Sequence, residues 1–437
     1  MLRGRTIVVG VSGGIAAYKA CELVRQLQSR GATVVVVMTR AATEFVTPLT
    51  FQALTGNPVV TTLWGDQAPA MKLPAAAALR TGGRVEHVDV AEAADALVLA
   101  PATADLMARI VHGEAPDALT SIVLAVRAPL IVCPSMDLEM WRKTVTQENV
   151  RALRARGATI VGPASGTLAS GLVGPGRLAD VADIVAAVET AVARRGSMQG
   201  VRVLIGAGRT EEPIDPVRIL TNRSSGRMGV ALAEAARARG AEVTLVAGVM
   251  DVDPPVHVKV DRVRTATEMQ RAMVRHAKAA AMVLMAAAVA DFRVKKAASE
   301  KIKRAAGGLT LELAANPDIL AGLGETRRIA ASGGLQSAGL PTLVGFALET
   351  SQGVARARAK LRGKGVDLIV LNTPAEGLGG DTNQVTLVEA RTQKKLPRMS
   401  KREVAEAVLD RVLELRRAVA VKPAGRAGAA RPRRGRR

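Results

Sequence analysis

Short apolar runs alternate with stretches of helical periodicity along most of the chain. Residues 6–10 and 33–38 are typical of buried strands, and the pattern between them predicts a helix over residues 17–30. The same arrangement recurs from residue 203, with a helix over 230–239, and Arg-Gly-Ala precedes the second strand in both places. Two such strand–helix–strand units predict two doubly wound α/β domains.

A glycine-containing segment at residues 194–200 separates the last helix of the first half from the next strand. We therefore expect domains over residues 1–196 and 197–418. Residues 419–437 are rich in Ala, Gly, Pro and Arg, which predicts a disordered basic tail without a core. Residues 327–340 are rich in Gly, Ser and Ala and are predicted to form a surface loop.

The composition narrows the classes of function. The net charge of +22 favours a nucleic-acid partner, but much of the excess lies in the tail, and aromatic residues make up only 2% of the chain. No apolar run approaches the ~20 residues of a membrane helix, and no signal peptide precedes the first strand. Two cysteines fit a reducing compartment. We therefore expect a cytoplasmic protein with no membrane contact and no specific nucleic-acid partner.

A candidate anion site lies at Ser224-Ser225-Gly226, directly before the second predicted helix. Hydroxyls and a glycine at a helix N-terminus leave backbone N–H groups and the positive end of the helix dipole facing an anion, typically a phosphate. An ordinary N-cap with a tight turn has the same residues. The neighbouring residues favour the phosphate site.

These neighbours are Thr210, Asp215-Pro216-Val217-Arg218 and Thr221-Asn222-Arg223. They resemble, almost letter for letter, the start of the phosphopantothenate–cysteine ligases. The resemblance implies a Rossmann-like α/β ligase domain in which CTP and 4'-phosphopantothenate form an acyl-cytidylate and pyrophosphate. The cysteine amine then displaces CMP, with Mg²⁺ sharing the charge at phosphorus.

Five ordered segments of the first half resemble the FMN-dependent cysteine decarboxylases, flavodoxin-like flavoproteins that are usually fused to that ligase. They are Val-Ser-Gly-Gly-Ile-Ala-Ala-Tyr-Lys at 11–19, Phe-Val-Thr-Pro-Leu-Thr-Phe at 45–51, Ala-Pro-Ala-Thr-Ala-Asp at 100–105, Pro-Ser-Met-Asp-Leu-Glu-Met-Trp at 134–141, and residues 162–177. Except for the tail, the chain thus resembles the coenzyme A biosynthesis bifunctional proteins, which ligate phosphopantothenate to cysteine and decarboxylate the product. The resemblance also implies a homo-oligomer.

The resemblance assigns residues of the first half to FMN and to decarboxylation. His87 matches a catalytic histidine, although a lone histidine is more often structural. The residues expected to line the FMN phosphate and ring are Gly13, Gly14, Thr39, Ala102 and Thr103.

Two residues depart from the decarboxylase pattern. Asp137 replaces an asparagine that donates to the substrate carboxylate. An ionised Asp137 would repel that carboxylate. Protonation of Asp137 would remove the repulsion but requires a raised pKa. Ser170 replaces a cysteine that acts as the final proton donor, and a hydroxyl is a far weaker acid than a thiol. We therefore expect flavin binding to survive and decarboxylation to be slow or absent.

In the ligase half, Asn222 matches the residue that holds the acyl-cytidylate, and Lys301 matches a loop lysine that closes over the triphosphate. Asp291 follows an apolar run at 282–288, and Lys360 and Lys364 share a helical face. The other residues expected to bind phosphopantothenate or CTP are Arg218, Ser224, Ser225, Gly226, Ala286, Ala287, Asn316, Pro317, Asp318, Ile319 and Phe346. No metal-ligating residue is assigned.

Three hypotheses follow. The first is a bifunctional enzyme with an intact ligase and a doubtful decarboxylase. The second is a monofunctional ligase whose flavin-binding first half is structural or regulatory. The third is a basic nucleic-acid-associated protein that uses its Arg-rich tail. A flavin chromophore would separate the first two from the third.

Overall fold

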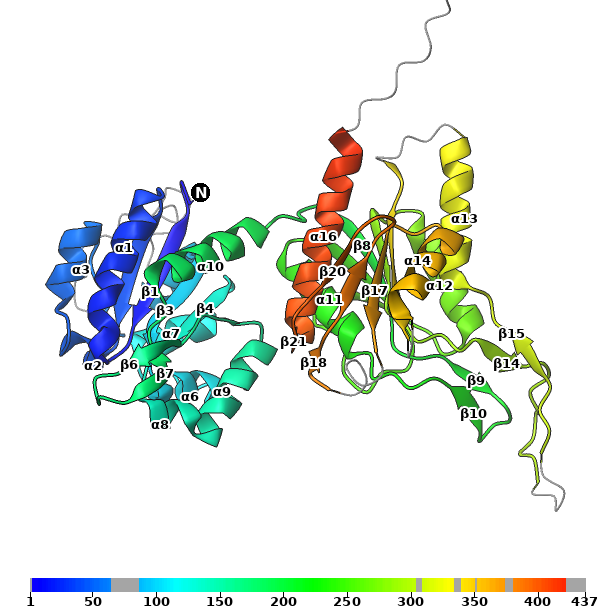
Figure 1. The fold of residues 1–437 in the computed structure, drawn as a ribbon, viewed down its shortest axis with the longest axis horizontal. Helices are drawn as coiled ribbons and strands as arrows, with labels where there is room; N and C mark the ends of the chain where they lie inside the picture. The colour runs from blue at the N-terminus through cyan, green and yellow to red at the C-terminus, as the bar shows by residue number, and fades with distance from the viewer. Residues whose placement is uncertain are drawn as a thin grey trace, which may run out of the picture. The chain divides into compact units, whose positions relative to one another are not determined.

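The computed structural model describes residues 2–63, 86–303, 309–333, 339–349, 352–373 and 380–421. By its internal contacts the chain divides into two compact units, Met1–Ser197 and Met198–Arg437 (Figure 1). None of the described helices is both long and apolar enough to cross a membrane. Residues 422–437, which hold most of the expected basic tail, lie outside the described ranges.

The first unit is built on a five-stranded parallel sheet of order β2-β1-β3-β4-β5. Runs such as Thr33–Met38 are β-branched and apolar and fill the buried centre of a parallel sheet. The strands are β1 Thr6–Val11, β2 Thr33–Met38, β3 Ala96–Ala102, β4 Leu130–Pro134, β5 Thr159–Ile160, and the separate hairpin β6 Ala164–Thr167 and β7 Val173–Arg177.

Helices cover both faces of this sheet. The side chains of α1, α3 and α10 form one core with alternate residues of β1 and β2, and those of α5, α6, α7 and α9 form the other. The helices are η1 Ile15–Tyr18, α1 Lys19–Ser29, α2 Arg40–Thr43, α3 Pro48–Thr55, α5 Glu86–Ala93, α6 Ala104–His112, α7 Ala118–Ala125, α8 Leu138–Arg142, α9 Thr144–Ala155 and α10 Val181–Arg194. The strand order and the two helical layers confirm the flavodoxin-like prediction.

The second unit contains an eight-stranded sheet of order β12-β11-β8-β13-β16-β17-β19-β20, whose first six strands are parallel. Its strands are β8 Arg202–Ala207, β11 Glu242–Ala247, β12 Lys259–Arg262, β13 Met282–Met285, β16 Thr342–Leu348, β17 Leu368–Asn372, β19 Thr386–Val388 and β20 Gln393–Lys395. Three two-stranded pairs accompany it: β9 Glu211–Pro213 with β10 Ile219–Thr221, β14 Phe292–Val294 with β15 Leu313–Ala315, and β18 Thr382–Asn383 with β21 Met399–Ser400.

Two helices pack on one face of this sheet and three on the other. The first pair is α11 Arg227–Ala238 and α16 Lys401–Val421, and the second group is α12 Ala266–Ala277, α13 Ile319–Ser332 and α14 Gly353–Lys364. This three-layer arrangement confirms the α/β prediction for the second half.

The expected surface loop at residues 327–340 is wrong for its first part, because α13 continues to Ser332. Arg327 is half-buried in this helix, donates to the carbonyl of Gly365 and pairs with Asp367. Residues 327–332 contain Arg, Ile and Ala but no glycine, so their helix propensity agrees with these contacts, and the glycines begin only at Gly333. Residues 334–338 lie outside the described ranges.

Candidate functional site

A cleft of about 1140 Å³ lies in the second unit, at the ends of strands β13, β16 and β17. In an open parallel sheet, ligands bind outside these carboxyl ends. Most of the residues predicted for the ligase line this cleft: Asn222, Ser224, Ser225, Gly226, Ala286, Ala287, Asp291, Asn316, Pro317, Asp318, Ile319, Phe346, Lys360 and Lys364.

The N-terminus of α11, directly after the Ser-Ser-Gly turn at 224–226, lines the cleft. Gly226 has a φ of 78°, which favours glycine, and a Cβ here would collide with Met250. One turn later, a Cβ on Gly229 would lie 2.3 Å from the Cβ of Ala207 on β8. The two glycines thus seat the start of α11 directly on the sheet, with its free N–H groups at the cleft wall.

Two asparagines are oriented by backbone carbonyls of the segment that follows β13. The Nδ2 group of Asn222 donates to the carbonyl of Val289 at 2.9 Å, and that of Asn316 donates to the carbonyl of Ala290 at 2.9 Å. The backbone N–H of Asn316 also donates to the carbonyl of Asp291. The segments around 222, 290 and 316 therefore form one hydrogen-bonded wall, although they lie far apart in the sequence.

The two lysines of α14 each face a carboxylate. Lys360 Nζ lies 2.6 Å from Glu349, and Lys364 Nζ lies 2.8 Å from Asp318, which also caps α13. The hydrogen bond from Lys360 lowers the pKa of the Glu349 carboxyl below its ordinary value. The pairs hold both ammonium groups on the cleft side of α14.

Two predicted residues do not line the cleft. Arg218 pairs with the buried Asp215 at 2.9 Å and donates to the carbonyl of Ile302, which ties the loop near residue 302 to the β9–β10 hairpin. Lys301 is exposed on this loop. Since Asp215 also accepts from the backbone N–H of Ile302, Arg218 stabilises the loop that carries Lys301.

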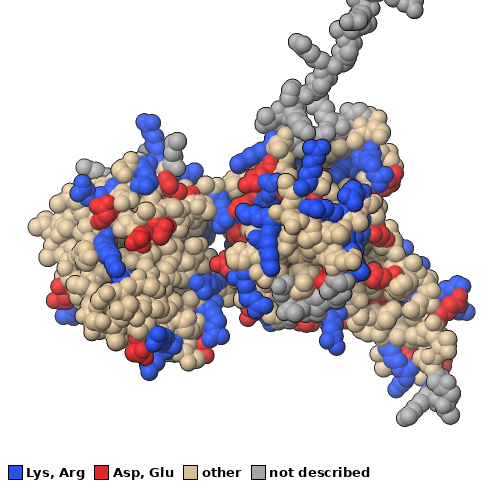
Figure 2. Space-filling view, in the orientation of Figure 1, with Lys and Arg blue, Asp and Glu red and all other residues tan. Residues whose placement is uncertain are grey.

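The lining is positively charged, with six basic residues, Arg209, Arg223, Arg227, Lys360, Lys364 and Lys401, against the three acids Asp251, Asp291 and Asp318. A cleft with this balance attracts phosphorylated substrates. Elsewhere, on the face drawn in Figure 2, acidic side chains are interspersed with the basic ones on both units. Within the described ranges, no three His, Cys, Asp or Glu side chains gather closely enough to hold a metal ion.

Several lining residues were not predicted, among them Arg209, Asn372, Asn383 and Lys401. Arg209 directly precedes Thr210, a residue of the ligase pattern. Asn372 and Asn383 end the late strands β17 and β18, and Lys401 begins α16, so only long-range strand pairing brings them to the cleft. The sequence offers no local signal for them.

In the first unit, the loops that follow β1, β2 and β3 meet at the carboxyl edge of the sheet. Ser12 donates to the carbonyl of Pro101 at 2.7 Å and accepts from the backbone N–H of Thr103. Thr39 and Thr103 cap the helices α2 and α6. The edge between β1 and β3 is the switch point of this topology, where a flavodoxin-like fold places its flavin.

The glycine turn after β1 has the tight geometry that a phosphate cradle requires. A Cβ on Gly13 would lie 2.4 Å from the Cβ of Ala41. A Cβ on Gly14 would instead have open space around it, with only the side chain of Thr103 within 4 Å. Ala102 is fully buried at the end of β3. The predicted residues therefore fit the phosphate end of FMN, because they combine close backbone approach with two helix starts.

His87 lies at the start of α5, and its Nδ1 is buried with no hydrogen-bond partner among the described residues. A buried ring nitrogen without a partner costs free energy unless a ligand or water supplies one. Burial without a partner is more consistent with a ligand-facing role than with a satisfied structural histidine.

The two departures from the decarboxylase pattern touch each other. Ser170, in the β6–β7 turn, donates to the carboxylate of Asp137, which caps α8. The hydrogen bonds from Ser170 and from the backbone N–H of Glu139 lower the pKa of Asp137. These hydrogen bonds thus favour the ionised form of Asp137, opposite to the raised pKa that would relieve repulsion of a substrate carboxylate.

Comparisons with known proteins agree with this division. The flavoprotein family model matches residues 1–193, and that of the DNA/pantothenate metabolism flavoprotein C-terminal domain matches residues 198–415. A protein from Vibrio cholerae, named coenzyme A biosynthesis bifunctional protein CoaBC, is 42% identical over 94% of this chain and 99% of its own. Its namesakes in Escherichia coli and Mycolicibacterium smegmatis are each 41% identical, over 94% and 93% of this chain and 97% of each relative.

Proposed function

Because this chain belongs to the family of coenzyme A biosynthesis bifunctional proteins, we propose that its second unit joins 4'-phosphopantothenate to cysteine with CTP. Its first unit binds FMN and acts on the product, phosphopantothenoylcysteine, by decarboxylation to 4'-phosphopantetheine. The observation that carries the proposal is the basic cleft of the second unit, which gathers fourteen residues predicted from the ligase pattern.

The cleft suits nucleotidyl transfer to a carboxylate. The α11 N-terminus and the lysines of α14 stabilise the phosphate charges of the two substrates, and Phe346 supplies an apolar surface for the base. Lys301, on the loop that Arg218 stabilises, binds the triphosphate. Asn222, fixed by the carbonyl of Val289, holds the acyl phosphate while the cysteine amine attacks.

The first unit contributes binding and orientation. The turn at Gly13 and Gly14 and the two threonine-capped helices hold the flavin phosphate. Bound FMN supplies the oxidation and reduction that make loss of the carboxylate feasible. His87 presents its unpartnered nitrogen as a proton acceptor or donor.

A monofunctional ligase is the second candidate, and the contact between Asp137 and Ser170 favours it. An ionised Asp137 repels the carboxylate of phosphopantothenoylcysteine, and its hydrogen bond with Ser170 leaves that hydroxyl proton engaged. Under this reading, the first unit binds FMN but does not complete decarboxylation.

One paired assay separates the candidates. The full chain is incubated with 4'-phosphopantothenate, CTP and cysteine, and pyrophosphate and carbon dioxide are measured together. Both products support the bifunctional enzyme, and pyrophosphate alone supports the monofunctional ligase. In the latter case the double variant Ser170→Cys with Asp137→Asn is expected to release carbon dioxide. Absence of pyrophosphate contradicts both candidates.

The role of Lys301 has a matched control on the same loop. Lys301→Gln is expected to lower the rate of pyrophosphate release, whereas Lys303→Gln, which removes an equally exposed charge two residues later, leaves it unchanged. Equal effects of the two substitutions would remove Lys301 from the reaction.

We further propose that Mg²⁺ enters with CTP, held mainly by phosphate oxygens. Chelation with EDTA then abolishes pyrophosphate release, and added Mg²⁺ restores it. We also propose that the protein is a cytoplasmic homo-oligomer. Cell fractionation would check its location, and sedimentation equilibrium of the purified chain would check its oligomeric state.

A further inference from the structure

A polar cluster at one wall of the cleft carries no assigned role. It consists of Arg227, the first residue of α11, Asn383 of β18, and Lys401, the first residue of α16. All three line the cleft together with the phosphate-binding turn.

Strand pairing assembles this cluster. Asn383 lies opposite Met399 in the β18–β21 pair, and the backbone N–H of Lys401 donates to the carbonyl of Asp381 at 3.1 Å. The side chain of Asp381 in turn pairs with Arg227 at 2.5 Å. Residues 381–383 and 401 are thereby fixed beside the N-terminus of α11.

Two members of the cluster are buried with only part of their hydrogen-bonding or charge-pairing capacity used. Lys401 is 8% exposed, and its ammonium group donates to the carbonyl of Gly380 but forms no ion pair with any described carboxylate. Asn383 is 3% exposed, and within the described ranges its Oδ1 accepts no hydrogen bond. Buried polar groups are costly unless they are paired. A ligand in the cleft would supply both partners.

The electrostatic surroundings of Lys401 favour an anion. Burial lowers the pKa of its ammonium group, the charge of Arg227 lowers it further, and Asp381 opposes both. A phosphate placed between the ammonium group, the Arg227 guanidinium and the N–H groups of α11 would relieve this repulsion.

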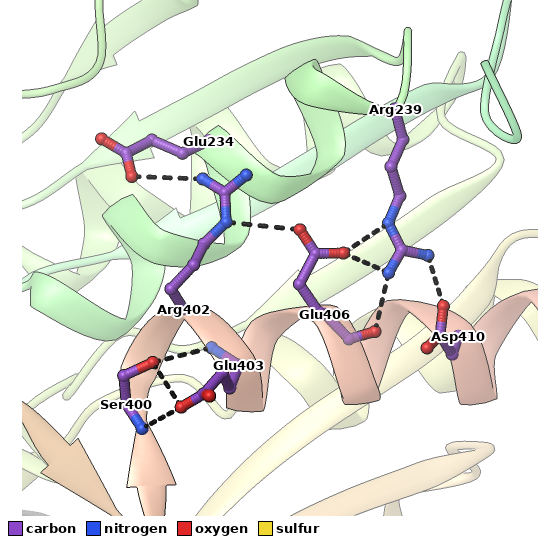
Figure 3. A network of polar contacts seen from close by, with 7 residues as sticks. All are labelled: Glu234, Arg239, Ser400, Arg402, Glu403, Glu406 and Asp410. Atoms are coloured by element: carbon purple, nitrogen blue, oxygen red, sulfur yellow. Dashed lines mark hydrogen bonds and ion pairs between the residues drawn. The ribbon is translucent and has the colours of Figure 1, made fainter. Parts of the chain in front are cut away.

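A second network fixes the helix that carries Lys401 (Figure 3). Arg239, from the end of α11, is 2% exposed; it donates to Glu406 at 2.8 Å and pairs with Asp410 at 2.7 Å, both on α16. Arg402 also reaches Glu234 on α11 at 3.5 Å. The network holds α16 against α11, so Lys401 has little freedom to leave the cleft.

We propose that Lys401, Asn383 and Arg227 bind the phosphorylated arm of the acid substrate. This proposal rests on the ligase function proposed above. Lys401 and Arg227 bind its phosphate beside the α11 N-terminus, and Asn383 accepts a hydrogen bond from a hydroxyl or amide N–H further along the arm. The unreacted end of the acid is thereby anchored while its carboxylate reaches Asn222.

The nucleotide also carries phosphates, so the test must tell the two substrates apart. The lysines expected to hold CTP lie on α14 and are paired with Glu349 and Asp318. Lys401 contacts neither carboxylate. The proposal therefore predicts that changes at Lys401 alter the use of the phosphorylated acid and leave the use of CTP unchanged.

The test measures steady-state pyrophosphate release by the full chain carrying Lys401→Met, with 4'-phosphopantothenate, unphosphorylated pantothenate and CTP varied in turn. The KM for the phosphorylated acid is expected to rise about 10- to 100-fold, as for loss of a hydrogen bond between charged groups. The KM values for pantothenate and CTP stay within about twofold. Lys401→Arg, which keeps the charge, recovers most of the loss, and Lys395→Met, which removes an exposed lysine of β20, has no effect.

Asn383→Leu is a second variant, because it keeps the volume of the side chain but removes Oδ1. It is expected to raise the KM for both acids and to leave that for CTP unchanged. If either variant raises the KM for CTP instead, the cluster holds the nucleotide and the proposal is wrong. Equal changes for all three substrates, or none, also overturn it. An inactive wild-type chain would instead contradict the ligase function itself.

Discussion

Gly229→Ala perturbs the start of α11 without changing any charge. The new Cβ would lie 2.3 Å from the Cβ of Ala207 and 3.2 Å from its Cα, so both the β8 side chain and its backbone stand in the way. Carbon atoms rest about 3.5–4.0 Å apart, and the helix start must therefore retreat by at least about 1.2 Å. The N–H groups that we propose to bind phosphate move with it.

A displacement of about 1 Å at a reacting site can cost about 100-fold in rate. We expect kcat/KM for pyrophosphate release to fall roughly 10- to 100-fold, with the phosphorylated acid varied at saturating CTP. Overpacking also costs about 1–3 kcal/mol of stability, offset in part by the roughly 1 kcal/mol gain of alanine over glycine in a helix.

Gly322→Ala is the matched control. Gly322 is an exposed residue of α13, and a Cβ there has no heavy atom within 4 Å. The substitution Gly322→Ala brings the same gain in helix propensity as Gly229→Ala but causes no clash, so pyrophosphate release should be retained. Far-ultraviolet circular dichroism and thermal unfolding of the full chain report whether the second unit of each variant folds. If Gly229→Ala keeps wild-type kcat/KM, close seating of α11 is not what positions the phosphate.

Three further predictions follow. Gly13→Ala places a Cβ 2.4 Å from that of Ala41 and is expected to yield protein without bound flavin; a variant with full flavin absorbance would contradict the phosphate cradle. Arg239→Met removes the buried guanidinium that links α11 to Glu406 and Asp410 of α16, at a cost of about 2–3 kcal/mol after allowing for the partial exposure of the two carboxylates. Hydrogen exchange across α16 should accelerate, and unchanged exchange would refute its anchoring role. Because Lys360 lowers the pKa of Glu349 from 4.5, their pairing stabilises the fold above about pH 4.5, and this contribution disappears as the pH falls through the lowered pKa. In urea titrations Glu349→Gln should therefore approach the wild type at low pH, and parallel pH profiles would argue against the pairing.

The sequence predicted both sheets because their strands are continuous apolar runs, a local property. The strand at residues 33–38 has the predicted bounds, since its residues are β-branched and apolar throughout. The helical end of α13 at Arg327 was missed because the expected loop was drawn from the glycines that follow Ser332, and the pairing of Arg327 with Asp367 is a tertiary contact that no local pattern reveals. The family and the overall fold were correctly predicted, since several spaced motifs carried them.

The candidate site was predictable where family motifs name its residues and not elsewhere. Asn383 and Lys401 reach the cleft through the pairing of two short strands, which no local pattern reveals. Asp137 and Ser170 were recognised as separate departures, but their mutual hydrogen bond depends on the fold of the β6–β7 hairpin. Only the structure shows that the second replacement donates a hydrogen bond to the first and lowers its pKa.

The central claim is that the cleft of the second unit activates a carboxylate as an acyl nucleotide. It is tested most directly by supplying phosphopantothenate labelled with ¹⁸O in both carboxylate oxygens, together with CTP and cysteine, and analysing the CMP released. Attack of the carboxylate on the α-phosphate followed by displacement by the amine leaves one ¹⁸O in CMP. Release of unlabelled CMP, or amide formation without CMP, would contradict the claim.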